Sequence, residues 1–304
     1  MPPPGKTASS RRYAIGAAQF EADALAPGLY SVATPLGNLG DVTLRALATL
    51  AASEFILCED TRQTAKLLSR YGIRVPLHAY HEHNAKQVRP AILARLKENA
   101  VMSLVSDAGM PLISDPGYRL AREAQAAGIA VTCCPGASAV ATALVLSGLA
   151  TDRFSFMGFM PQKSSERARV LAELTYLSAT AIFFESPRRI VATLREIAHI
   201  MPERMIAVAR ELTKLHEECL RGKASEIAET LAARPTVKGE ITLLIGPSAI
   251  TAEAASEAAI DGAIREALHS MPASRAASHI ARRFDLNRQD VYARILARKA
   301  SSDG

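Results

Sequence analysis

The fold of this chain is decided by the stretch Tyr30-Ser-Val-Ala-Thr-Pro-Leu-Gly-Asn-Leu-Gly-Asp41, where a short apolar run stops at proline, glycine and aspartate. Three more stretches share this design: Ser106–Gly117, Cys134–Ser138 and Phe183–Arg189. Such an ending is typical of a buried strand, and in open α/β sheets the loops after these strands form a crevice for small ligands. Gly and Pro fix unusual backbone geometry there, while Asp, Ser and Thr supply hydrogen bonds. The sequence therefore predicts a cleft built from backbone groups and short polar side chains.

Strand-like and helix-like segments alternate on both sides of this stretch. The predicted strands are Leu29–Ala33, Phe55–Cys58, Val101–Ser106 and Ala130–Cys133. The predicted helices are Thr43–Ala51, Thr61–Tyr71, Ala85–Glu98 and Tyr118–Ala127, with Thr43 and Thr61 as N-caps. Because alternating strands and helices usually build βαβ units, the pattern indicates an α/β domain with a largely parallel sheet.

A second, smaller α/β unit is predicted after a helix at Ala137–Ser147 that ends at Gly148. Its predicted strands are Phe154–Met157, Ala181–Glu185, Met205–Arg210 and Glu240–Ile245, and its predicted helices are Ser165–Leu177, Arg189–Ile200 and Ser225–Ala232. The predicted division of the 304 residues is a flexible N-terminal extension (1–27), two α/β domains (28–149 and 150–248) and a basic helical module (258–304). A chain of this length can support two domains with separate cores.

The composition is that of a folded protein from a reducing compartment. Hydrophobic residues make up 49% of the chain and the mean hydropathy is +0.08. No apolar run approaches the roughly 20 residues that a membrane-spanning helix needs. The four cysteines show no CxxC pair and no zinc-ligand spacing, which favours the cytoplasm. His81 and His83 resemble a metal pair, but no third ligand is evident, so no metal is predicted.

The net charge of +6 is concentrated at the C-terminal end. Residues 262–304 contain eight Lys or Arg residues and four acids, so they contribute +4. Such a basic module predicts a polyanionic partner, with RNA favoured over a membrane because no large apolar face accompanies the charge. A solvated helix surface is the alternative. Ser274–Phe284 and Asn287–Lys299 are predicted as helices, either in a helix–turn–helix hairpin or simply docked on the core.

The loop after the first strand is not a standard nucleotide motif. Thr34 to Asp41 matches neither GxGxxG nor a phosphate-binding P-loop. The second loop combines an acid at Asp107, a hydroxyl at Ser114 and glycine backbone amides. This chemistry suits a ligand that carries ribose hydroxyls and a charged amino-acid end.

Five motifs carry a resemblance to a known family: Gly28–Asp41, Cys58–Arg62, Ser106–Gly117, Phe183–Arg189 and Arg210–Glu217. Together they resemble the small-subunit ribosomal RNA ribose methyltransferases of the tetrapyrrole-methylase superfamily. The resemblance runs from about Gly28 to Ile245, and a basic C-terminal module is also expected in that group.

The resemblance implies a two-domain tetrapyrrole-methylase-like (class III methyltransferase) α/β fold with a small helical C-terminal module. It implies S-adenosylmethionine as cofactor, bound between the domains, and 2′-O-methylation of a cytidine ribose in the decoding region of 16S rRNA. The expected partners are 16S rRNA in the small ribosomal subunit and a second copy of the chain in a cytoplasmic homodimer.

The resemblance also assigns residues to the cofactor cleft. The implied cofactor-binding residues are Thr34, Pro35 and Gly37; Asp107, Ala108, Gly109, Ile113 and Ser114; Pro135, Gly136, Ala137 and Ser138; and Phe184, Glu185 and Pro187.

The proposed acceptor, a ribose hydroxyl, is a weak acid, so methyl transfer to its oxygen requires assistance in removing the proton. A general base or a stabilising cation should therefore face the substrate. The favoured set is Glu59, Asp60, Arg62, Glu211 and Lys214. Two alternatives stay open: Glu59 and Asp60 would also suit a helix N-terminus, and Arg62 and Lys214 would also suit phosphate contacts.

Two other functions fit parts of the sequence. A tetrapyrrole C-methyltransferase would share the fold and the cofactor, but it would have no need of a basic module. A non-catalytic ribosome-assembly factor would use the module and keep the cleft as a relic, since fold alone never establishes activity.

Overall fold

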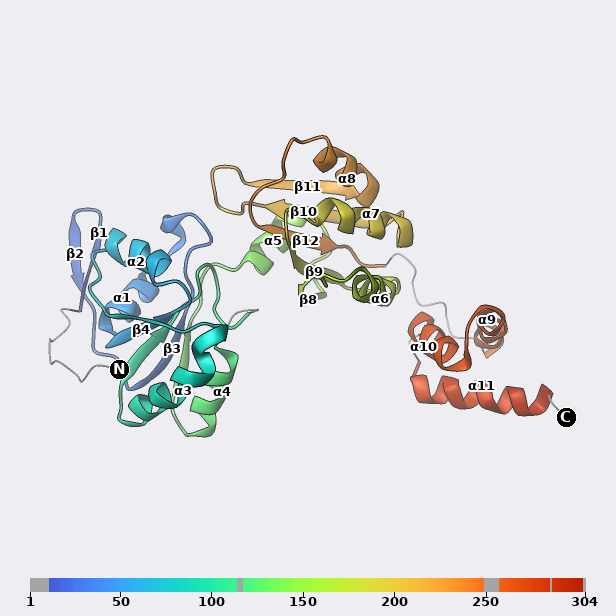
Figure 1. The fold of residues 1–304 in the computed structure, drawn as a ribbon, viewed down its shortest axis with the longest axis horizontal. Helices are drawn as coiled ribbons and strands as arrows, with labels where there is room; N and C mark the ends of the chain where they lie inside the picture. Colours follow the sequence, from blue (N-terminus) through green and yellow to red (C-terminus); the bar gives the residue numbers. More distant parts are fainter. Residues whose placement is uncertain (1–10, 114–116, 249–256, 285, 303–304) are drawn as a thin grey trace.

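A computed structural model describes residues 11–113, 117–248, 257–284 and 286–302 of the chain. Two α/β parts lie side by side and a group of three helices follows at the C-terminal end (Figure 1). No helix within these described ranges has the length and apolar character needed to cross a membrane.

The first sheet is entirely parallel, where the sequence predicted a largely parallel one. Its strands are β3 (Gly28–Val32), β4 (Phe55–Cys58), β5 (Leu77–Ala79), β6 (Val101–Leu104) and β7 (Val131–Cys134), in the order β5-β4-β6-β3-β7. Parallel neighbours need long crossover connections, and the intervening helices supply them. The short β5 was not predicted from the sequence.

Helices cover both faces of this sheet. Apolar side chains on α1 (Leu44–Ala52) and α2 (Thr61–Arg70) pack with one face, and those on α3 (Glu82–Lys97) and α4 (Tyr118–Ala126) pack with the other. The adjacent strands β3 and β6 lead to helices on opposite faces, β3 to α1 and β6 to α4. Loops that leave neighbouring strands in this way open a crevice at their carboxyl ends.

The second sheet is mainly antiparallel. It contains β8 (Phe154–Phe159), β9 (Thr180–Glu185), β10 (Met205–Arg210), β11 (Glu218–Lys223) and β12 (Ile241–Ile245) in the order β11-β10-β12-β9-β8, and only the β8–β9 pair is parallel. Its apolar core on one face involves α6 (Ser164–Leu174), α7 (Ile190–Ile200) and α8 (Ala224–Ala232). The sequence pattern did not predict β11.

Helix α5 (Ala139–Ser147) covers the other face of the second sheet. Its residues Val140, Ala143 and Leu144 share a buried cluster with Ile182 and Leu244 of that sheet. The predicted division after residue 149 assigns this helix to the first domain. Its packing places it with the second domain instead, because its apolar surface is buried there.

The N-terminal segment contains a hairpin. Strands β1 (Arg12–Ile15) and β2 (Ala18–Glu21) pair with each other, and Tyr13 stacks on Phe20 with ring centroids 5.3 Å apart. The amide of Ala14 donates to the carbonyl of Tyr71 at 2.8 Å. The prediction of a flexible extension is therefore wrong for this hairpin, while residues 1–10 lie outside the described part.

The C-terminal module has a core of its own. Helices α9 (Glu257–Ser270), α10 (Ala273–Arg283) and α11 (Arg288–Ser302) bury Ile264, Ile280 and Ile295 against one another. The module contacts α6 and the residues after it through an ion pair between Arg282 and Glu173 (3.6 Å) and ring packing of His279 on Tyr176. The two helices predicted from the sequence are present as α10 and α11, and among the described residues α9 precedes them.

Candidate active site

A cavity of about 330 Å³ lies between the two α/β parts. It opens where the loops after β3, β4 and β6 meet the second sheet. This position is expected, because β3 and β6 are neighbours whose following helices lie on opposite faces of the first sheet. Its lining residues are Leu36, Glu59, Asp107 and Ala108 from the first part, Ala139 from α5, and Phe159, Phe184, Glu185, Pro187, Leu212, Gly239, Glu240, Ile241 and Thr242 from the second.

Two backbone hydrogen bonds tie the first two loops together. The amide of Thr34 donates to the carbonyl of Gly109, and the amide of Gly109 donates back to Thr34, both at 2.9 Å. The Thr34 hydroxyl also donates to the carbonyl of Ser106 at 3.1 Å. Gly109 has φ +78°, and a Cβ there would come within 2.9 Å of the Leu36 side chain. Glycine fits this position without strain, whereas any other residue would be strained by this φ and would force the Leu36 side chain to shift.

Asp107 joins a third loop to this pair. Its Oδ1 accepts a hydrogen bond from the amide of Asp60 at 3.0 Å, which connects the loop after β6 to the loop after β4. Two acidic residues, Asp107 and Glu59, line the same cavity.

The predicted cofactor residues divide into those that line the cavity and those that do not. Asp107, Ala108, Phe184, Glu185 and Pro187 line the cavity. Nine other predicted cofactor residues lie in the described part of the chain but do not line the cavity: Thr34, Pro35, Gly37, Gly109, Ile113, Pro135, Gly136, Ala137 and Ser138. Thr34 and Gly109 fix the shape of the lining loops. Ser114 lies outside the described residues.

Aromatic rings form part of the second wall. The ring of Phe184 packs edge-on against Phe156 and Phe159, with centroids 4.9 and 5.4 Å away. Phe184 and Phe159 line the cavity, so this side offers an apolar surface. The sequence motif predicted Phe184 but not Phe159, which comes from the far end of a separate strand.

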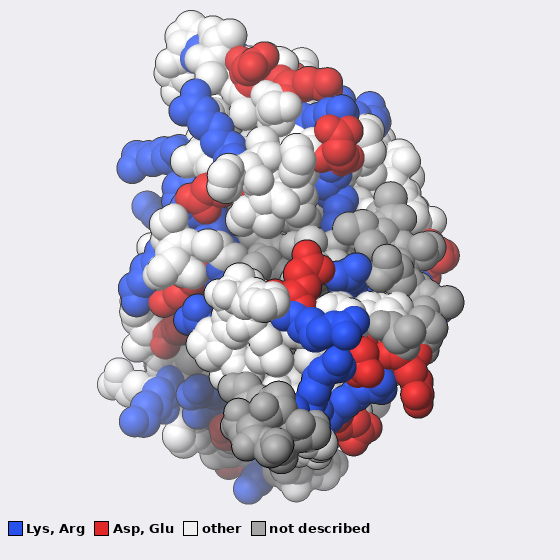
Figure 2. Space-filling model, turned by 90° about the vertical axis from the view of Figure 1, so that its right-hand side faces the viewer, with Lys and Arg blue, Asp and Glu red and all other residues white. Residues whose placement is uncertain are grey.

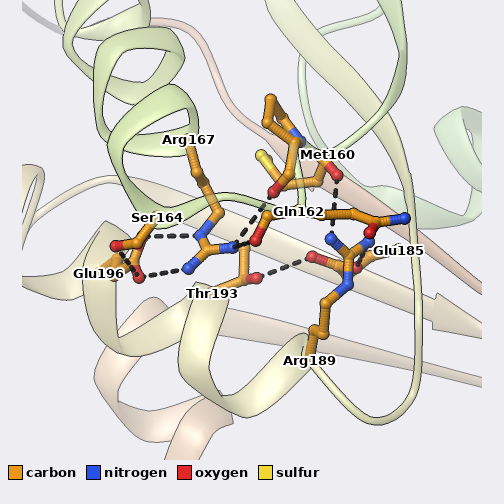
Figure 3. Close-up of polar contacts among 9 residues, drawn as sticks. Met160, Gln162, Ser164, Arg167, Glu185, Arg189, Thr193 and Glu196 are labelled. Carbon is orange, nitrogen blue, oxygen red and sulfur yellow. Dashed lines mark hydrogen bonds and ion pairs between the residues drawn. The ribbon is translucent and has the colours of Figure 1, made fainter.

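Glu185 is held by the protein itself (Figure 3). Its side chain has no exposed surface, and its carboxylate accepts from the Arg189 guanidinium at 2.6 Å, the Ser186 amide at 2.6 Å and the Thr193 hydroxyl at 2.7 Å. Arg189 also donates to the carbonyl of Met160 at 3.3 Å. The polar atoms of Glu185 therefore fix the cavity wall onto α7, since protein donors occupy them.

A neighbouring ion pair extends this network. The guanidinium of Arg167 donates to Glu196 and to the carbonyls of Pro161 and Gln162 (Figure 3). It thus connects α6, α7 and the segment after β8. The Glu196 interaction raises the pKa of Arg167, while Arg167 lowers the pKa of Glu196.

The predicted pair Asp60 and Arg62 is not in the cavity lining. Asp60 is the N-cap of α2, so the predicted cap at Thr61 is wrong by one residue. Its carboxylate accepts from the amide of Arg62 and from the guanidinium at 2.8, 3.0 and 2.7 Å. These hydrogen bonds with Arg62 lower the pKa of Asp60 to about 2. Asp60 is therefore a weak base at neutral pH, and the helix N-terminus accounts for its place.

Lys214 bridges two acids beside the cavity. Its ammonium lies 2.9 Å from Glu211 and 3.0 Å from Glu240, and Glu240 lines the cavity. Burial alone would lower the pKa of Lys214, but the hydrogen bonds to Glu211 and Glu240 raise it overall. The hydrogen bond from Lys214 lowers the pKa of Glu211. Lys214 therefore remains a cation at neutral pH and lies between two acidic side chains.

Several lining residues escaped the sequence analysis. Leu212 lies in the Arg210–Glu217 motif but was not assigned to the site, whereas Glu240 and Thr242 belong to none of the quoted motifs. Both lie at the start of a segment that was predicted only as a strand. The one available indication was the acid Glu240 next to Gly239 at a strand start. The antiparallel pairing of β12 with β9 brings the start of β12 to the cavity.

The histidine pair contributes nothing further. His81 is the N-cap residue of α3 and packs against His83 at 6.0 Å between ring centroids. Among the described residues, no group of three or more His, Cys, Asp or Glu side chains is arranged to hold a metal.

A parallel sheet joined to a mainly antiparallel one, with a ligand-sized cavity between them, defines a class of two-domain α/β proteins that bind a small ligand between their domains. The chain belongs to the family of tetrapyrrole (corrin/porphyrin) methylases, whose model matches residues 28–228. This family uses S-adenosylmethionine as methyl donor. A second model, of the RsmI C-terminal HTH domain, matches residues 254–299.

Relatives match nearly the whole chain. It is 46% identical over 289 residues to the "Ribosomal RNA small subunit methyltransferase I" of Mesorhizobium japonicum, covering 95% of this chain and 98% of the relative. It is 48% identical over 278 residues to the protein of that name from Erythrobacter litoralis, covering 91% and 98%. Among solved structures, the cobalt precorrin-4 methyltransferase CbiF has a TM-score of 0.53 at 15% identity, covering 72% of this chain and 94% of its own. That structure supports the fold alone.

We expect Arg189→Met to destabilise the protein by about 3 kcal/mol, because it leaves the buried Glu185 carboxylate without its cation. Glu185→Gln combined with Arg189→Met should recover most of this loss. Urea unfolding followed by circular dichroism measures both.

The matched control is Arg62→Met, which removes an exposed arginine and should leave the unfolding midpoint unchanged. An Arg189→Met midpoint equal to that of the unsubstituted protein would show that the buried pair does not hold the cavity wall.

Proposed function

We propose that this chain methylates the ribose 2′-oxygen of a cytidine in the decoding region of 16S rRNA. The observation that carries the proposal is the combination of a methylase cavity with a basic helical module in one chain. CbiF, a cobalamin biosynthetic enzyme, is matched over 94% of its length but over only 72% of this chain. The unmatched quarter leaves room for a part that a small substrate would not require.

The surface of the module supports an RNA partner. Arg265, Arg275 and Arg288 are exposed on its three helices. Figure 2 views the molecule from the end that carries the module and displays many Lys and Arg side chains among fewer acidic ones. Basic residues of this kind bind the phosphates of nucleic acids without reading the sequence.

The cavity fits the cofactor of the family. Its volume of about 330 Å³ lies at the lower end of the usual range for small-molecule sites. The lining combines apolar surface from Leu36, Phe184 and Leu212 with the carboxylates of Glu59 and Asp107. Asp107 suits hydroxyl groups or a cationic amine, and Phe184 suits a flat ring. S-adenosylmethionine, when bound, supplies an electrophilic methyl group.

The chain contributes alignment and proton transfer. We assign Glu59 as the group that accepts the proton of the ribose hydroxyl, because it is the carboxylate of the predicted catalytic set that lines the cavity. Lys214 holds Glu240 at the cavity through its ion pair and remains a cation. Asp60 caps the start of α2 and pairs with Arg62, and the Asp60 amide donates a hydrogen bond to Asp107.

A homodimer in the cytoplasm completes the proposal. Strand β8 lies at the edge of the second sheet and exposes Phe154, Met157 and Phe159. Unpaired edges with apolar side chains are usually covered by a partner. Because Phe159 also lines the cavity, a second copy on this edge would close one side of the site.

The central test is a map of ribose methylation in 16S rRNA from cells with and without this protein. We expect one methylated cytidine in the decoding region to disappear when the protein is absent. An unchanged map would contradict the proposed function.

Complementation of the deletion tests Glu59. We expect Glu59→Gln to lower the methyl-transfer rate about a hundredfold to ten-thousandfold, since a positioned base contributes about that much. Asp60→Asn is the matched control and should keep most of the rate. Equal losses in the two variants would remove Glu59 from the role of base.

Truncation after Ser248 tests the module. We expect the shortened chain to bind S-adenosylmethionine as before, but to bind rRNA more weakly and with a flatter dependence on salt. RNA affinity equal to that of the full chain would make the module purely structural.

The dimer has its own test. We expect Met157→Asp to give monomers in light scattering, because it places a charge in an apolar contact. Leu44→Asp, at another exposed apolar side chain on α1, should remain a dimer. Dimers of Met157→Asp would place the interface elsewhere.

A further inference from the structure

A second depression lies beside the cavity, on the other side of the loops that follow β3 and β10. It has a volume of about 780 Å³ and is open to solvent. Its lining residues are Gly37, Asn38, Leu39 and Gly40 from the loop after β3, Arg70 and Tyr71 from the end of α2, and Thr213, Lys214 and Leu215 from the loop after β10. We call it the outer groove.

The loops that follow β3 and β10 form the wall between the cavity and the outer groove. Leu36 and Leu212 face the cavity, while the next residues in each loop, Gly37 and Thr213, face the groove. The amide of Asn38 donates to the Thr213 hydroxyl at 3.2 Å and joins the loops. A molecule too large for the cavity can therefore extend from its mouth to the groove past one thin wall.

The loop from the second domain has a defined shape that its own side chains stabilise. Glu211 and Thr213 have φ of +52° and +64°, which side chains other than glycine seldom adopt. Glu217 stabilises this shape by accepting from the Thr213 amide at 2.6 Å. The stem of Lys214 occupies the space that a side chain at position 37 would need, so Gly37 permits the close approach. The groove is thus preformed.

The chemistry of the outer groove suits RNA. Its lining includes Arg70 and Lys214 and no carboxylate. Lys214 is neutralised by Glu211 and Glu240, so Arg70 supplies the available positive charge. The side chain of Leu215 is 93% exposed and that of Leu39 is 39% exposed, and together they offer apolar surface to a base.

Helix α2 connects the two depressions with a line of cations. Arg62, Lys66 and Arg70 are spaced four residues apart and exposed, so they lie about 6 Å apart along one side of the helix. The helix contains no acidic residue between Thr61 and Arg70. Within the part of the chain that the structure describes, Arg62 pairs with Asp60, whereas Lys66 donates to the neutral side chain of Gln63. The helix starts beside Glu59 at the cavity and ends at Arg70 in the groove.

We propose that α2 and the outer groove bind the RNA strand that flanks the nucleotide in the cavity. Lys66 and Arg70 contact successive phosphates, and a flanking base rests on Leu39 and Leu215. This surface is separate from the C-terminal module and gives the catalytic domains an RNA contact of their own. The inference rests on the proposed RNA substrate and adds to it the place where the strand runs.

The test compares two double variants of the full chain with equal loss of charge. Lys66→Ala with Arg70→Ala removes the proposed phosphate contacts. Lys86→Ala with Lys97→Ala removes two exposed lysines from α3, which packs on the opposite face of the first sheet. The probe is a synthetic RNA fragment of the 16S decoding region, followed by fluorescence anisotropy over a range of salt concentrations.

We expect the α2 variant to bind the fragment roughly tenfold more weakly at low salt, with the slope of log affinity against log salt reduced by about 1.4. Its KM for RNA should rise, and its affinity for S-adenosylmethionine should not change. The α3 variant should behave like the unsubstituted protein.

Equal RNA affinities of the two double variants, whether both normal or both weakened, would overturn the proposed path. If the unsubstituted protein itself neither binds nor methylates the fragment or small subunits, the proposed function fails and the path fails with it. Leu215→Ser gives an independent reading, because it should weaken RNA binding without changing the salt slope. An unchanged affinity in that variant would remove the base contact.

Discussion

The reciprocal backbone hydrogen bonds between Thr34 and Gly109 are the constraint on which the site depends. They join the loops after β3 and β6, which lead to opposite faces of the sheet, and so fix the shape of the crevice at this edge. Gly109 can take part only because it has no side chain. Asp107, two residues earlier, then reaches the amide of Asp60 and brings the loop after β4 into the same wall. The first half of the cavity follows from these contacts.

The environments of the acidic residues separate their roles. Glu185 is buried and accepts three protein donors, so it supports the wall. Asp60 caps α2 and pairs with Arg62, and Glu211 is held by Lys214. Glu59 and Asp107 line the cavity. The sequence places all of these residues at or near strand ends. Only their packing shows which carboxylates have a structural role and which are available to a ligand.

The sequence predicted the first domain closely because buried parallel strands and their helices have strong, local patterns. Phe55–Cys58 was placed to the residue, and so was Met205–Arg210 in the second domain. The hairpin at Arg12–Glu21 and strand β11 were missed, since both are exposed or half-buried and rich in polar residues. Likewise, the loops with Asp107 and Phe184 were found through their turn residues. Glu240 and Phe159 reach the cavity only through strand pairing, which no local pattern records.

The account requires that the methyl donor binds between the two α/β domains, in the cavity shaped by the Thr34–Gly109 contact. Calorimetric titration of S-adenosylmethionine into the unsubstituted protein and into Gly109→Ala tests this most directly. We expect the unsubstituted protein to bind, and the variant, with an unchanged circular dichroism spectrum, to bind at least about tenfold more weakly, because the added Cβ strains the loop and meets Leu36. Equal affinity in both proteins, or no binding by the unsubstituted protein, would contradict the account.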